Sequence, residues 1–67
     1  MYLKRVNMKL FMLKYRFHDC VDEYFIEAVN ITVGRVKLKK LLKDNEVAVG
    51  LFEYFKGKKW VERSLEG

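Results

Sequence analysis

The chain has 67 residues, 51% of them hydrophobic, and its 14 Lys and Arg against 9 Asp and Glu give a net charge of +5. This length accommodates one hydrophobic core and excludes a second domain. The single cysteine, Cys20, excludes an intramolecular disulfide, and Lys or Arg interrupts every apolar run before it reaches the roughly 18–20 residues of a membrane-spanning helix.

We therefore expect one domain over residues 1–67. Met8 indicates an alternative initiation site, so residues 1–7 are expected to be a flexible extension, and residues 65–67 are expected to fray. The start of the chain lacks the uninterrupted apolar stretch of a signal peptide. A reduced, cytoplasmic location is the expectation that follows.

The first half of the chain predicts two strands. The segment Lys9–Phe17 alternates in the way typical of a strand that is covered on one side, and the polar segment His18–Asp22 has the length of a hairpin loop. The segment Glu23–Ile31 predicts a second strand. The side chains expected to share one face of the first strand are Phe11, Leu13, Tyr15 and Phe17. The two faces of the second strand carry Phe25, Val29 and Ile31, and Tyr24, Ile26 and Ala28, respectively.

The segment Val33–Lys43 predicts a helix with one narrow apolar side. Thr32 suits the N-cap because its hydroxyl can accept an amide hydrogen, and Asn45 can adopt the left-handed conformation that stops a helix. The competing interpretation is a strand, because residues 35–39 alternate strictly between charged and apolar side chains. The adjacent like pairs at 39–40 and 41–42 break that alternation and favour the helix. Its core-facing residues are expected to be Leu38, Leu41 and Leu42, with Gly34 on the same side.

The segment Glu46–Phe55 predicts a third strand, because it is rich in β-branched and aromatic residues. Gly50 inside it indicates a bulge or a close backbone approach. The alternative is a helix that starts at Asn45 and forms a helix-turn-helix with the preceding one, but Gly50 and the two valines disfavour it. Residues 56–59 predict a turn, and Trp60–Arg63 a short last strand.

Together these elements predict an α+β fold, a small two-layer β-β-α-β-β domain with one helix packed on an antiparallel sheet. If the central segment is instead a strand, the alternative is a five-stranded SH3-like or OB-like small barrel. Phe52, Tyr54 and Phe55 must point to both faces of a strand, so at least one ring is expected on the face away from the helix, where it would serve dimerisation or docking. Trp60, the largest apolar side chain, is expected to close the core, with base stacking as the alternative.

Catalytic chemistry is not indicated. His18 and Cys20 are neighbours in one loop, whereas a Cys–His pair normally comes together from distant parts of a sequence. A zinc site needs about four ligands, and His18, Cys20 and Asp22 make an unsuitable trio. The acids Asp19, Asp22 and Glu23 are expected to be a solvated loop, with a divalent-cation site as the alternative. There is no glycine-rich phosphate loop or nucleophile elbow. We therefore expect no enzyme activity, no cofactor and no metal.

The basic residues carry the leading functional hypothesis, which is contact with nucleic acid through its phosphate backbone with little sequence readout. Tyr24 or Tyr54 would give the first strand an aromatic and basic open face. The candidate residues on the helix, the lysine turn and the first strand are Arg35, Lys37, Lys39, Lys40, Lys43, Lys56, Lys58, Lys59, Trp60, Lys14 and Arg16.

Three other hypotheses compete with nucleic-acid binding. The lysines can serve solubility alone, or they can bind an acidic surface of a host protein. In the second case the chain would be a protein–protein adaptor or inhibitor, of the kind that small phage or mobile-element genes encode, which is an analogy from size and isolation. A structural homodimer is the last hypothesis.

Overall fold

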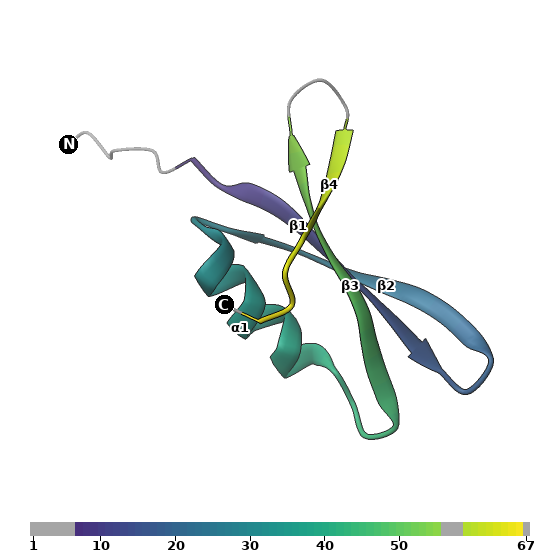
Figure 1. Cartoon of the computed structure of the whole chain (residues 1–67). Coiled ribbons are helices and arrows are strands. Elements are labelled where there is room, and N and C mark those ends of the chain that lie inside the picture. Colours follow the sequence, from purple (N-terminus) through teal and green to yellow (C-terminus); the bar gives the residue numbers. More distant parts are fainter. Residues whose placement is uncertain (1–6, 56–58, 67) are drawn as a thin grey trace.

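The computed structural model describes residues 7–55 and 59–66, which form one four-stranded antiparallel sheet and one helix (Figure 1). The strands lie in the order β2-β1-β3-β4, and the helix lies on one face of the sheet. This confirms an α+β domain with the predicted succession of elements. The alternative barrel receives no support, because it required a strand where the chain is helical. The elements are β1 (Lys9–Phe17), β2 (Cys20–Ala28), α1 (Ile31–Leu41), β3 (Glu46–Phe55) and β4 (Lys59–Arg63).

The hairpin between β1 and β2 is tighter than the sequence predicted. Phe17 pairs with Cys20, which leaves a turn of only His18 and Asp19 where we expected a loop over residues 18–22. His18 has φ 57°, the left-handed value that the favoured two-residue hairpin turns need at their first central position. The second strand therefore begins three residues earlier than predicted, and it ends at Ala28 instead of Ile31.

Three corrections concern α1, which begins two residues earlier than predicted. Asn30, not Thr32, is the N-cap, and its Oδ1 accepts a hydrogen bond of 2.9 Å from the backbone N–H of Val33. The helix ends at Leu41, and its C-cap residue Leu42 is extended. Asn45 does adopt a left-handed φ of 73°, but it lies in the turn that leads into β3 rather than at the helix end.

The core lies between α1 and the adjoining face of the sheet. Leu38 is fully buried as predicted, and Gly34 faces the same way, so close to the sheet that a Cβ there would lie 2.9 Å from Cδ2 of Phe11. Leu41 is 41% exposed, which contradicts the prediction, because the earlier helix start centres the apolar side on Ile31, Gly34 and Leu38. The buried apolar residues are Phe11, Leu13, Ala28, Leu38 and Leu51.

The bulge predicted at Gly50 is present. Lys14 pairs with Gly50 whereas Tyr15 pairs with Ala48, so Val49 is an extra residue in β3. Because successive residues of a strand point to opposite faces, this insertion lets Ala48 and Leu51 both face the helix side. It also places Phe52 and Tyr54 on the face that α1 does not cover.

Candidate nucleic-acid interface

The face of the sheet opposite α1 carries a group of aromatic and apolar side chains. The pairing register places Phe25, Met12 and Phe52 across three adjacent strands, and Tyr54 opposite Trp60 on β3 and β4. The ring centroids of Tyr54 and Trp60 are 5.1 Å apart, and those of Phe25 and Trp60 are 6.0 Å apart. No described helix lies over this open face (Figure 1). The prediction that at least one ring of residues 52–55 faces away from the helix is therefore confirmed by Phe52 and Tyr54. Trp60 is 37% exposed and belongs to this group, so its predicted place in the core is wrong.

Two basic side chains share the open face with these rings, both on the central strand β1. Lys14 Nζ lies 5.7 Å from the centroid of the Phe52 ring, within the range of a cation–π interaction. Arg16 is exposed, and its neighbours across the sheet are Val21 and Val47. Among the described residues, neither Lys14 nor Arg16 forms an ion pair. Both cations are therefore available to a ligand.

Acidic side chains occupy only the borders of the open face. Glu23 and Glu27 lie on the edge strand β2, opposite Lys14 and Leu10, and Glu62 lies on the other edge strand, β4, opposite Phe52. The central strands β1 and β3 carry no acid on this face, because Glu46 and Glu53 point to the helix side. We use the name central track for the basic and aromatic residues of the open face on β1, on β3 and at the start of β4: Arg16, Lys14, Phe52, Tyr54 and Trp60.

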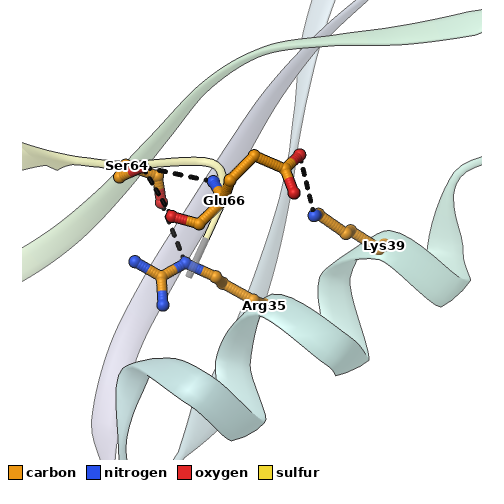
Figure 2. A network of polar contacts seen from close by, with 4 residues as sticks. All are labelled: Arg35, Lys39, Ser64 and Glu66. Atoms are coloured by element: carbon orange, nitrogen blue, oxygen red, sulfur yellow. Dashed lines mark hydrogen bonds and ion pairs between the residues drawn. The ribbon is translucent and has the colours of Figure 1, made fainter.

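The predicted basic face of the helix lies on the other side of the molecule, and part of it is engaged. Arg35 Nε donates a hydrogen bond of 2.9 Å to the carbonyl oxygen of Ser64, and Lys39 Nζ lies 3.3 Å from Oε2 of Glu66 (Figure 2). The segment after β4 thus runs back along α1 and contacts two of the five predicted helix cations (Figures 1 and 2). The other three predicted cations, Lys37, Lys40 and Lys43, are exposed, and Lys43 lies beyond the end of α1.

The structure therefore does not bring all of the predicted site residues together. Lys14, Arg16 and Trp60 lie on the open face, whereas the cations of α1 lie beyond the opposite face. Lys59 is exposed, but its pairing with Phe55 places it on the helix side of β4. Lys56 and Lys58 lie outside the described residues.

Tyr24, which we expected near Lys14 and Arg16, faces the helix side of the sheet. Its ring stacks on Tyr15 with centroids 4.4 Å apart, and its hydroxyl donates a hydrogen bond of 2.8 Å to Glu46 Oε1. This hydrogen bond to Glu46, with burial and Tyr15 as lesser causes, raises the pKa of Tyr24 well above its ordinary value. The same Glu46 oxygen accepts the backbone N–H of Lys43 at 2.9 Å. Tyr24 therefore fixes the turn between α1 and β3, and only Tyr54 belongs to the open face.

Glu53 is a buried acid that the sequence interpretation did not single out. It is only 2% exposed, on the helix side of β3, where its carboxylate forms ion pairs with Arg63 and Lys9. A carboxylate at such a position needs compensating charge, since an unpaired buried charge is costly. No signal in the sequence distinguished Glu53 from the exposed acids, because Arg63 becomes its neighbour only through the pairing of β3 with β4.

The candidate residues of the first hairpin lie apart. The ring of His18 packs edge-on against Phe17, with centroids 4.2 Å apart. Cys20 and Asp22 belong to β2 and share its helix side, whereas Glu23 lies on the open face. Of the three acids predicted to form a solvated loop, Asp19 lies in the two-residue turn, whereas Asp22 and Glu23 lie on β2. The described part of the chain has no group of three His, Cys, Asp or Glu placed to hold a metal ion. In the same residues, no helix is long and apolar enough to cross a bilayer.

Comparison of the chain with protein-family models, with curated proteins and with solved structures finds no match.

Proposed function

We propose that this chain binds single-stranded nucleic acid along the central track of the open sheet face. The observation that carries the proposal is the arrangement of Arg16 and Lys14 beside the rings of Phe52, Tyr54 and Trp60 on an uncovered face. Aromatic rings that accept stacked bases, next to cations that follow the backbone, are the two components of single-strand recognition.

The order of the residues suggests how a strand would lie. Bases would stack on Phe52, Tyr54 and Trp60, and the phosphates next to them would meet Lys14 and Arg16. Glu23 and Glu27 on one border and Glu62 on the other repel phosphates. The nucleic acid would therefore run along β1 and β3 rather than across the sheet. A duplex keeps its bases stacked on each other and cannot use the rings, so it would bind more weakly.

The helix has a smaller part in this proposal than the sequence alone suggested. Lys37 and Lys40 are exposed, but α1, which carries them, lies on the opposite side of the sheet from the open face (Figure 1). Cations so far from the bound strand act only through long-range attraction, which salt screens over about 10 Å at 0.1 M. They would raise the rate of encounter without fixing the ligand.

A protein partner is the second candidate, and one observation favours it. The open face has two cations against three carboxylates at its borders, which is the pattern of an apolar docking surface with a charged rim. A folded host protein would then cover the same rings. Unlike nucleic acid, such a partner would bind with an affinity that depends little on salt.

Binding of fluorescently labelled single strands of four to sixteen nucleotides, RNA and DNA, tests the proposal by anisotropy and by quenching of Trp60 fluorescence. We expect Trp60→Ala to weaken binding by about 5- to 150-fold, since stacking on one ring contributes about 1–3 kcal/mol per base. Phe55→Ala is the matched control, because Phe55 is 41% exposed, follows Tyr54 on the same strand and faces the other way. We expect it to bind like the unaltered chain.

Two outcomes would overturn the proposal. One is the absence of binding to any single strand at low salt. The other is an equal loss of affinity in Trp60→Ala and Phe55→Ala, which would mean that the rings act through stability and do not contact bases. Salt-independent capture of a folded protein that is lost in Trp60→Ala would instead support the second candidate.

A further inference from the structure

The strand β2 leaves a row of backbone groups without a partner among the described strands. It lies at the edge of the sheet and pairs only with β1. Phe17 and Cys20 flank the two-residue turn and so exchange backbone hydrogen bonds, and in an antiparallel pair every second residue does the same. The backbone groups of the residues in between therefore point away from the sheet. These residues are Val21, Glu23, Phe25 and Glu27. The N–H of Glu23 donates an exposed hydrogen bond of 2.8 Å to Oδ1 of Asp22, which an added strand would have to replace.

The charge of this edge is opposite to that of the rest of the chain. Residues 17–34 contain four acids and no Lys or Arg, in a chain whose net charge is +5. On the open face, Glu23 and Glu27 stand on either side of Phe25, which is 55% exposed. Neither glutamate forms an ion pair in the described part of the structure. The edge thus presents an acidic, apolar and acidic side chain in a row, together with outward-pointing backbone groups that no described strand pairs with.

The surroundings of Glu27 leave room for a long side chain. An open pocket of about 430 Å³ lies next to the start of β1, and Glu27, Glu53, Tyr54 and Leu10 are among the residues that line it. Since Arg63 and Lys9 already neutralise Glu53, Glu27 is the carboxylate of this pocket that remains available. Carboxylates beside an aromatic ring suit the long aliphatic chain and cationic end of Lys or Arg.

We propose that the free edge of β2 binds an extended basic peptide segment of a partner protein, which adds a fifth strand to the sheet. The partner would carry two basic residues four positions apart, with an apolar residue midway between them. The basic side chains would meet Glu23 and Glu27, the apolar one would cover Phe25, and backbone hydrogen bonds would form along the strand. This is recognition by strand addition, in which the backbone provides affinity and alternate side chains provide specificity.

A second copy of this chain fits the same edge poorly. An antiparallel pairing of β2 with the β2 of another copy, centred on Phe25, would set Glu23 of each chain opposite Glu27 of the other. Like charges directly opposite each other destabilise a sheet. The acidic edge therefore disfavours self-association and favours a basic strand.

The proposal does not require nucleic-acid binding, because Glu23 and Glu27 border the central track and are not part of it. It is tested with a labelled probe peptide, Gly-Thr-Lys-Thr-Val-Thr-Lys-Thr-Gly, by anisotropy and by NMR of the complex. We expect protection of the amide hydrogens of Val21, Glu23, Phe25 and Glu27 from exchange, and not of the alternate residues between them. The double variant Glu23→Gln, Glu27→Gln should lower the affinity at least tenfold.

Two controls separate strand addition from simple charge attraction. Glu62→Gln removes an acid from the other border of the same face and should leave peptide binding unchanged. A peptide of the same sequence with every second amide N-methylated, on the side that would face β2, keeps its charge but should not bind. Equal binding of both peptides, protection without the two-residue alternation, or an equal effect of Glu62→Gln and the double variant would each overturn the proposal. Nucleic-acid binding by the double variant should persist in every case.

Discussion

Both faces of the sheet carry large apolar side chains, but α1 covers only one of the two faces. On the helix side, Phe11, Leu13 and Leu51 are almost fully buried under α1. On the open side, Phe25 and Trp60 are 55% and 37% exposed, although their side chains are at least as large as those of the core. An apolar face of this kind is costly to leave uncovered in water. The covered face therefore provides stability, and the exposure of the rings is the reason why we propose the open face as the ligand-binding surface.

The largest expected effect is the difference in stability lost when a buried side chain of the core and an exposed ring of the open face are each replaced by alanine. Leu38→Ala should destabilise the domain by about 2–5 kcal/mol, because the side chain is fully buried and leaves a cavity. A core of this size supplies only about 3–5 kcal/mol, so this variant should be largely unfolded. Phe25→Ala should cost less than about 1 kcal/mol, because the ring is mostly in solvent already. Urea denaturation followed by circular dichroism measures both, and equal losses would contradict the contrast between the faces.

Alanine substitutions at Gly34 and Gly50 compare the two faces through a smaller change in stability. A Cβ on Gly34 would lie 2.9 Å from the buried ring of Phe11, and a Cβ on Gly50 would lie 2.9 Å from the far edge of the Phe52 ring. Phe11 cannot move without separating α1 from the sheet, so Gly34→Ala should destabilise by about 1–2 kcal/mol even though alanine favours helix by about 1 kcal/mol. The Phe52 ring can turn towards the open face, so Gly50→Ala should change stability by less than about 0.5 kcal/mol. Thermal unfolding of the two variants decides this, and a larger loss in Gly50→Ala would mean that the open face is as rigid as the core.

Most of the fold could be predicted from the sequence because local pattern determines it. The alternation of residues 9–17 predicted the limits of β1, the β-branched and aromatic content of residues 46–55 predicted those of β3, and Gly50 indicated the bulge. The prediction was wrong at the ends of elements, where the preference of a single residue for a cap or a turn decides where a helix or strand begins. Asn30 caps the helix in place of Thr32, and His18 tolerates a positive φ that closes a two-residue turn. Neither preference can be read from hydrophobic periodicity.

The candidate site was predictable only in part, because it depends on which strands are neighbours. Alternation places Lys14 and Arg16 on one face of β1, but only the strand order brings Tyr54 and Trp60 to the same face. The helix cations were the most conspicuous feature of the sequence. The path of residues 64–66 back along α1, which engages Arg35 and Lys39, had no signal in the sequence.

The proposal that the open face rather than the helix holds nucleic acid is tested most directly by the salt dependence of single-strand binding in two matched double variants. Each phosphate contact contributes about 0.7 to the slope of log affinity against log salt concentration. Lys14→Ala, Arg16→Ala should therefore lower the magnitude of the slope by about 1.4, whereas Lys37→Ala, Lys40→Ala removes the same charge from the far side and should leave the slope within about 0.3 of the unaltered chain. A slope that falls in the helix variant and not in the strand variant would contradict the account.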